Sequence, residues 1–261
     1  MSSGTEVQRS GDGRLAGRAA VVTGVGSGLG RAIAGELAAE GASVLGCDVN
    51  DTAGEATMAG LGLFRHADVS READVAALVD DAVSSFGHLD VMVNNAAIQI
   101  EQELIETTEA ELDRVLAVNL KGPFFGCKHA VRVMRVSGGG VIVNVASILA
   151  LVGDGILAAY CAAKGGVLGI TRATAVQYGS VGIRCNAICP GDIDTPLVQA
   201  YFETAGDPEA LRRQVSGAYP LGRIAQPREI ARAVVFLASD DSSFMTGEAM
   251  VVDGGLLATC Y

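Results

Sequence analysis

"AVVTGVGSGLGRAIAGEL", residues 20 to 37, decides the fold of this chain. The stretch begins as a short apolar run, passes through closely spaced glycines, and continues with Leu29, Ile33 and Leu37 at helical spacing. This order is typical of a buried strand that turns directly into a helix. Glycines at such a turn let the backbone bend tightly and let a phosphate approach the free N–H groups of the helix N-terminus. The stretch therefore predicts the first strand–helix unit of an α/β domain, with an anion site at the turn.

The same alternation continues to the end of the chain. Strands are expected at residues 18–24, 42–49, 63–70, 89–97, 139–147, 182–191 and 247–255, and helices at 29–41, 73–87, 108–136, 158–179 and 227–240. Strands with two apolar faces between helices predict a parallel sheet that helices cover on both sides, joined by right-handed crossovers. The predicted fold is a single-domain, Rossmann-like, doubly wound α/β sheet of about seven strands. The long helix at 108–136 is expected to bend near Gly122 and Pro123.

Two segments depart from this rhythm. Residues 1–13 carry no apolar pattern and are expected to form a flexible tail before a single domain at 14–261. Residues 192–218 form a long insertion after the sixth strand. Insertions at the carboxyl ends of strands often close over a substrate, so this segment is expected to be a lid.

Composition excludes several classes of partner. The net charge is −11, and the basic residues are scattered, which argues against nucleic acid and against an anionic membrane surface. Three histidines and six cysteines without paired spacing indicate neither a zinc site nor a disulfide framework, so no metal is expected. There is no signal-peptide pattern and no apolar run of the ~18 residues that a span requires. We expect a cytoplasmic protein with no membrane partner.

The glycine turn and the end of the second strand together point to a dinucleotide. Gly24, Ser27, Gly28, Leu29 and Gly30 occupy the turn where a pyrophosphate would meet the helix N-terminus. Asp48, followed by Val49, ends the second strand, where a carboxylate accepts hydrogen bonds from an adenosine ribose and repels a 2′-phosphate. The predicted cofactor is NAD and not NADP. The alternatives are a glycine turn without a ligand and an aspartate that only caps a turn.

Tyr160 and Lys164 lie one helical turn apart in a chain that has only three lysines. A free tyrosine, with a pKa of about 10, is a poor base at neutral pH. A lysine on the same helix face favours the phenolate, which would let the tyrosine move a proton. Such a pair also arises by chance, so a catalytic role for it has to be supported by other motifs in the sequence.

The remaining motifs resemble one family. They are the glycine motif at 23–30, Asp68-Val69, Asn94-Asn95-Ala96, Asn119, Ser147, Tyr160 with Lys164, and Pro190-Gly191. In order and spacing this set is similar to the short-chain dehydrogenases/reductases over about residues 15 to 257. One position departs from the pattern, because Ala97 stands where the family has glycine.

The resemblance implies a catalytic set. Tyr160 would be the general acid and base of hydride transfer, and Lys164 would favour its phenolate and hold the nicotinamide ribose. Ser147 would hydrogen-bond the substrate oxygen. Asn119 would hold a water that links the lysine to solvent. The alternatives are a serine that only ends a strand and an asparagine that only caps a bend.

The resemblance also implies the remaining cofactor contacts. Asp68 and Val69 would flank the adenine, and Asn95 and Ala96 would line the ribose and nicotinamide side. The last group, at the nicotinamide carboxamide, consists of Pro190, Gly191, Ile193 and Thr195.

The expected activity is the NAD-dependent interconversion of a secondary alcohol and a ketone, by a homotetramer. The alternatives are an NADPH-dependent ketone or 3-oxoacyl-thioester reductase and a non-catalytic dinucleotide-sensing protein. The apolar residues between Ser147 and Tyr160, with Leu197, Val198, Tyr201 and Phe202 of the insertion, suit a moderately apolar substrate or only pack the lid. A steroid, a cyclic alcohol or diol, a sugar and an acyl thioester all stay open, as does the role of Asp154.

Overall fold

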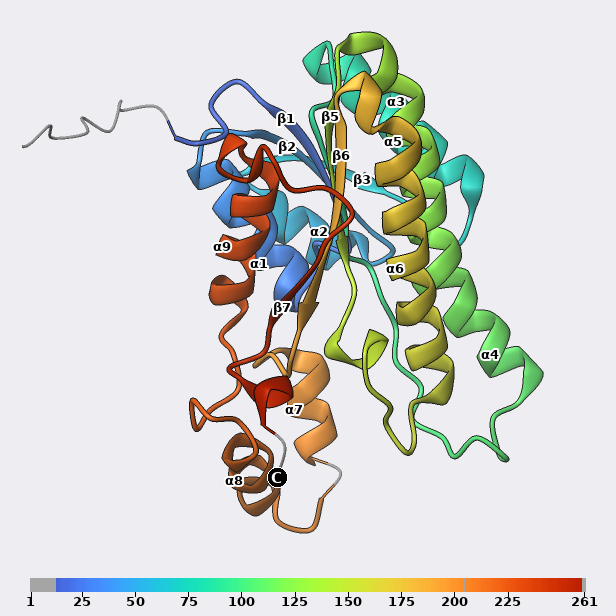
Figure 1. Ribbon diagram of the computed structural model, residues 1–261, viewed down its shortest axis with the longest axis vertical. Coiled ribbons are helices and arrows are strands. Elements are labelled where there is room, and N and C mark those ends of the chain that lie inside the picture. Colours follow the sequence, from blue (N-terminus) through green and yellow to red (C-terminus); the bar gives the residue numbers. More distant parts are fainter. Residues whose placement is uncertain (1–12, 204, 260–261) are drawn as a thin grey trace, which may run out of the picture.

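The computed structural model describes residues 13–203 and 205–259. The tail expected at residues 1–13 lies outside this range except for its last residue. The described chain is built on one parallel sheet of seven strands in the order β3-β2-β1-β4-β5-β6-β7 (Figure 1). Its strands are β1 Ala19–Thr23, β2 Ser43–Asp48, β3 Gly62–His66, β4 Val91–Asn94, β5 Gly140–Val145, β6 Ile183–Pro190 and β7 Ala249–Val252. The predicted doubly wound, Rossmann-like fold is confirmed.

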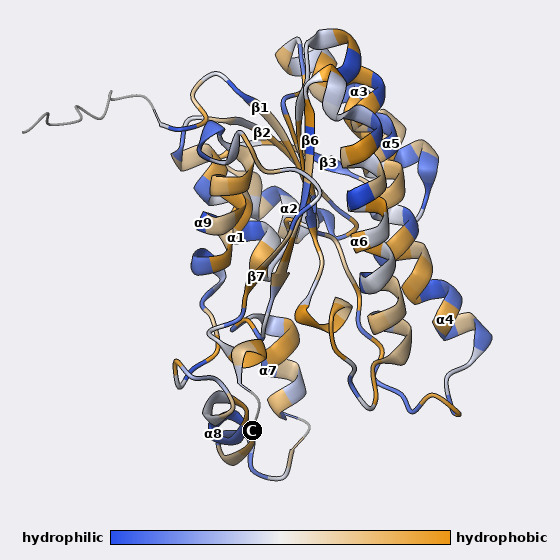
Figure 2. Ribbon diagram, in the orientation of Figure 1, coloured by the Kyte–Doolittle hydropathy of each residue, from blue (hydrophilic) through white to orange (hydrophobic). Residues whose placement is uncertain are grey.

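Helices cover both faces of the sheet (Figure 1). One face carries α1 Gly28–Ala39 and α9 Pro227–Ala238, whose apolar side chains form one core with β1 and β5. The other carries α3 Glu72–Phe86, α5 Gly122–Ser137 and α6 Ala158–Tyr178, which pack a second core. Apolar residues gather in the strands and on the helix sides that face them (Figure 2). None of the helices in the described ranges is long and apolar enough to cross a membrane.

Three helices lie where the sequence pattern gave no helix. They are α2 Asp51–Met58, between β2 and β3, and α7 Pro196–Glu203 and α8 Pro208–Gly217, in the insertion that follows β6. The α2 helix is only eight residues long, and it begins at Asn50, whose side chain accepts a hydrogen bond from the Ala53 N–H. Too few apolar positions fall in so short a helix to reveal a period.

The long helix expected at 108–136 is divided in the structure. It consists of α4 Glu109–Leu116, a π-helical turn at Ala117–Lys121, and then α5. Gly122 and Pro123, where a bend was expected, begin α5, because proline is tolerated in the first turn of a helix. The irregularity therefore precedes the proline and contains Asn119.

Parallel pairing brings the carboxyl ends of the strands to one edge of the sheet. The register pairs Thr23 with Cys47 and Asn94 with Asn144. The segments that follow these strands therefore emerge side by side, and ligands bind at this edge in open α/β sheets.

Candidate active site

A cavity of about 980 Å³ opens at the carboxyl edge of the sheet. Every residue that the sequence assigned to the cofactor lines it: Gly24, Ser27, Gly28, Leu29, Gly30, Asp48, Val49, Asp68, Val69, Asn95, Ala96, Tyr160, Lys164, Pro190, Gly191, Ile193 and Thr195. Ser147 lines it too, whereas Asn119 does not. The volume is at the upper end of the ~300–1,000 Å³ that is usual for small-molecule sites.

The glycine turn leaves the start of α1 open toward this cavity. Gly24 and Gly28 have φ angles of +74° and +51°, which favour glycine. A Cβ on Gly30 would lie 1.9 Å from the Gly24 carbonyl oxygen, so no side chain fits there. Ser27 precedes the helix but does not cap it with its side chain, and no acidic residue lies in the first turn. The N–H groups of this turn are thus available to an anion.

Asp48 is held rigidly at the end of β2. Its Oδ2 accepts a hydrogen bond from the Gly26 N–H (2.8 Å), and its Oδ1 accepts one from the Asn50 N–H (2.9 Å). Of the described residues that line the cavity, Lys164 is the only basic one. The end of the cavity at Asp48 therefore presents a fixed carboxylate and, among the described lining residues, no basic side chain other than Lys164.

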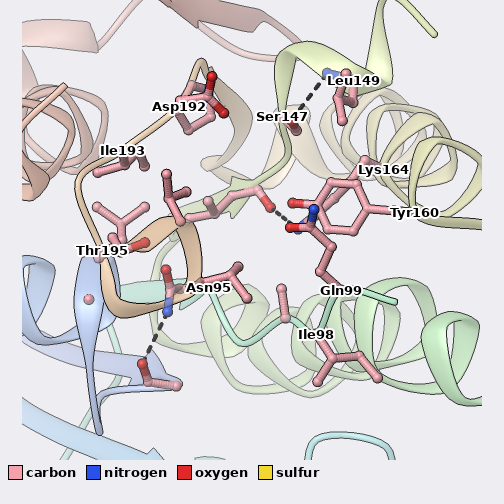
Figure 3. A pocket seen from close by; sticks show the side chains of 18 of the residues that line it. Asn95, Ile98, Gln99, Ser147, Leu149, Tyr160, Lys164, Asp192, Ile193 and Thr195 are labelled. Atoms are coloured by element: carbon pink, nitrogen blue, oxygen red, sulfur yellow. Dashed lines mark hydrogen bonds between the residues drawn. The ribbon is translucent and has the colours of Figure 1, made fainter. Parts of the chain in front are cut away.

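Asn95 shapes the turn from the neighbouring strand. Its Nδ2 donates to the Thr23 carbonyl oxygen (2.8 Å) and lies 3.2 Å from that of Gly24 (Figure 3). The Thr23 hydroxyl in turn accepts hydrogen bonds from the N–H groups of Asn95 and Ala96, at 3.0 Å each. These bonds tie the end of β4 to the end of β1.

Ser147, Tyr160 and Lys164 lie close together in the lining of the cavity (Figure 3). Ser147 follows β5, and its Oγ accepts a hydrogen bond from the Leu149 N–H (3.1 Å). Tyr160 and Lys164 come from the first two turns of α6. Lys164 is 1% exposed. It donates to the Val145 carbonyl oxygen (2.7 Å) and lies 5.4 Å from the centre of the Tyr160 ring.

Burial shifts the pKa values of Tyr160 and Lys164 in opposite directions, and each shift favours the neutral form of the group. It raises the pKa of Tyr160 to about 12, although the hydrogen bond with Ser147 works against the rise and the carboxylate of Asp192 adds to it. It lowers the pKa of Lys164 to about 8. The sequence predicted that the lysine would favour the phenolate. In the protein alone, desolvation is the larger effect on both groups.

Asn119 is fully buried in the π-helical turn. Its Nδ2 donates to the Ile98 carbonyl oxygen (2.7 Å), and its Oδ1 accepts from the Ile98 N–H (2.8 Å). Both polar atoms of the side chain thus hold the backbone of the segment that follows β4.

Comparison with known proteins assigns the family. A family model described as enoyl-(acyl carrier protein) reductase matches residues 24–257. The chain belongs to the short-chain dehydrogenases/reductases. It is 45% identical to cis-4-hydroxycyclohexanecarboxylate dehydrogenase of Sinomonas cyclohexanicum, over 94% of this chain and 98% of the relative. It is 42% identical to levodione reductase of Leifsonia aquatica, over 93% of this chain and 95% of the relative. A crystal structure of levodione reductase superposes with a TM-score of 0.91 at 40% identity, over 95% of this chain and all of the other. The chain is therefore an oxidoreductase of this family.

Further residues of this short-chain dehydrogenase/reductase line the cavity without having been singled out from the sequence. They include Ile98 and Gln99 after β4, Asp192 after β6, and Leu256 near the C-terminus. The signal available for Gln99 was its position, because it follows closely on the end of a central parallel strand. Asp192 is fixed by Tyr219, whose hydroxyl donates to its Oδ2 and accepts from its N–H, at 2.7 Å each.

The insertion contributes the apolar wall. Leu197, Val198, Tyr201 and Phe202 of α7 all line the cavity, together with Val215 of α8. Phe202, 3% exposed, also packs in a small core of its own with Tyr219 and Ile224. These apolar side chains therefore line the cavity, and Phe202 also packs within the insertion and against the chain that follows it.

Proposed function

We propose that this protein is an NAD-dependent oxidoreductase that interconverts a small secondary alcohol and its ketone, with Tyr160 as general acid and base. One observation carries the proposal. Ser147, Tyr160 and Lys164 line the same cavity as the open N-terminus of α1 and the carboxylate of Asp48. A proton-transfer group and a dinucleotide cradle in one cavity are what hydride transfer requires.

Residues around the cavity are suited to hold each part of a dinucleotide. The N–H groups of the first turn of α1 would hold the pyrophosphate, and Asp48 the adenosine ribose. Asp68 and Val69 would flank the adenine, and the segment from Pro190 to Thr195 would hold the nicotinamide end. When bound, the nicotinamide supplies the site that accepts or returns a hydride.

The chain's own residues handle the proton and the charge. Tyr160 in its phenolate form takes the hydroxyl proton of the alcohol on Oη and returns it in the reverse direction. The Ser147 hydroxyl donates a hydrogen bond to the substrate oxygen as negative charge develops there. Lys164, 5.4 Å from the ring centre, favours the phenolate whenever it is charged. Asn119 fixes the backbone of Ile98, so any water in a relay to Lys164 would be held by the main chain of the π-helical turn.

The preference for NAD follows from Asp48. A 2′-phosphate would meet a carboxylate that two backbone N–H groups keep in place. No arginine or lysine among the described cavity residues stands at that end to receive the phosphate. The same feature opposes the NADPH-dependent ketone or acyl-thioester reductase that the sequence left open.

The substrate class is supported by the relatives and by the wall of the cavity. The relatives named above are described as acting on a hydroxycyclohexanecarboxylate and on levodione, and another, 39% identical, as a dehydrogenase of a dichlorocyclohexadiene diol. The apolar wall of α7 suits such rings. We propose a cyclic secondary alcohol, oxidised beneath a lid formed by residues 192–218. The active assembly is a homotetramer, which calibrated gel filtration tests: elution at the size of the 26.6 kDa monomer would contradict it.

The experiment is an absorbance screen at 340 nm with NAD⁺ and NADP⁺ over cyclic alcohols, diols, steroids and polyols. We expect reduction of NAD⁺ with a cyclic alcohol, at a kcat/KM at least about tenfold above that with NADP⁺. Asp48→Ala is the matched variant, and it should narrow this preference. A wild-type preference for NADP⁺ would overturn the cofactor assignment. Absence of turnover with either dinucleotide would favour the non-catalytic alternative.

A further inference from the structure

The segment that follows β4 is pinned at two points on either side of Gln99. On one side, the side chain of Asn119 holds both backbone polar groups of Ile98. On the other, the Gln102 N–H donates to the Ile156 carbonyl oxygen (2.8 Å), and Gln102 forms an isolated parallel bridge with Leu157. Leu157 directly precedes α6, the helix that carries Tyr160. The backbone at Gln99 is therefore fixed relative to the catalytic helix.

The side chain of Gln99 enters the cavity. Its carboxamide points toward Tyr160 and Lys164 in the close view (Figure 3), and all three residues line the same cavity. Within residues 13–203 and 205–259, no hydrogen bond engages this carboxamide. By contrast, the Lys164 ammonium is bound to the Val145 carbonyl, and the Asp192 carboxylate accepts from the Tyr219 hydroxyl. A polar group that is held in place beside the reacting atoms and left without a partner is available to a ligand.

The ionisable side chains around the cavity are mostly acidic. Asp48, Asp68, Glu101, Asp154 and Asp192 line it, and Lys164 is the only cation among the described residues that do. Arg212, on the lid, is occupied by Asp194 at 2.7 Å and is not part of the lining. A carboxylate or phosphate on the substrate would meet like charges without a free counter-ion.

We propose that Gln99 is a substrate-binding residue, which hydrogen-bonds a second oxygen on an uncharged cyclic alcohol. The inference rests on the proposed function and narrows it to neutral diols and hydroxyketones. An amide both donates and accepts, so it pairs with a hydroxyl or with a carbonyl oxygen. Ser147 and Tyr160 engage the reacting oxygen, and Gln99 engages the other one. A substrate without that second oxygen leaves the amide unpaired in the closed site, which lowers its kcat/KM.

The test compares four probes with NAD⁺: cyclohexanol, cyclohexane-1,2-diol, cyclohexane-1,4-diol and 4-hydroxycyclohexanecarboxylate. In the wild type we expect the better diol to exceed both cyclohexanol and the carboxylate by about tenfold in kcat/KM. In Gln99→Leu this advantage over cyclohexanol should fall to within about twofold, because the diol loses a hydrogen-bond partner and cyclohexanol no longer leaves an amide unpaired. Gln102→Leu is the matched control: it removes an amide from the same segment but outside the cavity, and it should keep the wild-type ratios.

A second variant tests whether the side chain at residue 99 donates or accepts the hydrogen bond to the second oxygen. Gln99→Glu can accept a hydrogen bond but, when ionised, cannot donate one. It should therefore keep more of the advantage of the diol than of cyclohexane-1,4-dione assayed in the direction of reduction, because the second oxygen of the dione is a carbonyl that only accepts. Each rate is divided by that of cyclohexanol or cyclohexanone, so that a general effect of the new charge on Tyr160 cancels.

Three results would overturn the inference while leaving the proposed function intact. The first is an unchanged diol-to-cyclohexanol ratio of kcat/KM in Gln99→Leu. The second is an equal loss of kcat/KM on every probe in that variant, together with a raised KM for NAD⁺. The third is a higher kcat/KM of the wild type for the carboxylate than for either diol. The second would assign Gln99 to the cofactor. A wild type that oxidises none of the probes and no other alcohol would overturn the proposed function and the inference together.

Discussion

At the scale of single residues, Tyr160 and Lys164 are shifted toward their neutral forms. Burial raises the pKa of the tyrosine to about 12 and lowers that of the lysine to about 8. In the protein alone at neutral pH, the phenol therefore keeps its proton. A general base is most effective when its pKa is near the working pH. For Tyr160 to act as the proposed base, binding of the positively charged oxidised nicotinamide would have to lower the pKa of the tyrosine.

Tyr160→Phe removes only the hydroxyl that carries the proton. We expect near-total loss of turnover, because such acid–base catalysis is typically worth about 10²–10⁴-fold. NAD binding should persist, as measured by fluorescence titration with NADH. A variant that keeps more than about a tenth of the wild-type kcat would contradict the role of Tyr160.

Oxidation of the alcohol should accelerate as the pH rises from 7 to 9. Below its pKa the tyrosine is protonated and cannot act as a base, so each pH unit raises the phenolate fraction by up to about tenfold. The gain should diminish above pH 8, because Lys164, with its pKa lowered to about 8, then loses the charge that supports the phenolate. Ketone reduction uses the protonated phenol and should not rise over this range. Profiles of kcat/KM in both directions test this, and a flat oxidation profile would contradict it.

At the scale of elements, the π-helical turn at Ala117–Lys121 links the catalytic helix layer to the segment after β4. It brings Asn119 to face Ile98, so that a buried amide and not a loop contact sets the position of that segment. Through the bridge at Gln102, the same segment is joined to the residues before α6. The active site is thus framed by hydrogen bonds between elements that lie far apart in the sequence.

Asn119→Ala should loosen this frame. It leaves the N–H and C=O groups of Ile98 without partners, at a cost of about 1–3 kcal/mol in the free energy of unfolding. We also expect a lower kcat and faster hydrogen exchange of the Ile98 amide than in the wild type. Urea denaturation and exchange measured by NMR test the two effects. An unchanged exchange rate at Ile98 would show that the amide does not hold this segment.

Long, strongly periodic elements could be predicted from the sequence, whereas short or irregular ones could not. The helix with Leu29, Ile33 and Leu37 lies where its apolar spacing indicated. The α2 helix escaped notice because eight residues hold too few apolar positions, although Asn50 offered a cap signal. The π-helical turn could not be predicted because no pattern of apolar residues marks such a turn. It becomes visible only in the structure, where Asn119 contacts Ile98.

The sequence could predict which residues belong to the site, but not their burial, their pKa values or their hydrogen-bond partners. Motif spacing identified the residues that line the cavity, since strand ends in a parallel sheet converge. It could not give the burial that shifts the pKa of Lys164, nor the contacts that occupy the side chain of Asn119. Gln99 was missed because a lone glutamine in a loop has no periodic signal, and its only sequence signal is its place shortly after the end of β4.

At the scale of the whole molecule, the buried lysine affects the stability of the fold. The pKa of Lys164 is about 8 in the folded protein and 10.5 in its ordinary state. Below pH 8 both states bind the proton, so the cost of burying the charge is fully present. Between pH 8 and 10.5 the unfolded chain binds more protons than the folded one, and stability from this group therefore rises with pH.

Lys164→Met keeps the bulk of the side chain and removes the titration. Relative to this variant, the wild type should gain about 2 kcal/mol in the free energy of unfolding between pH 7.5 and 9.5. Groups that titrate alike in both proteins contribute equally to the free energy of unfolding, so their contributions cancel in the difference. Denaturant unfolding at the two pH values measures the difference. No change in that difference would mean that Lys164 is not held in the dry environment that its contacts indicate.

The described residues that line the cavity gather at the carboxyl edge of the sheet, away from its amino edge. Gly87 ends α3 with a φ of +85°, and a Cβ there would meet nothing within 4 Å. This turn precedes β4 at the amino edge of the sheet, so it lies on the side away from the cavity. A fluorophore, an affinity tag or an immobilising linker inserted beside Gly87 would leave the reaction untouched, which makes this turn the natural point of attachment for a biosensor or a surface-bound catalyst.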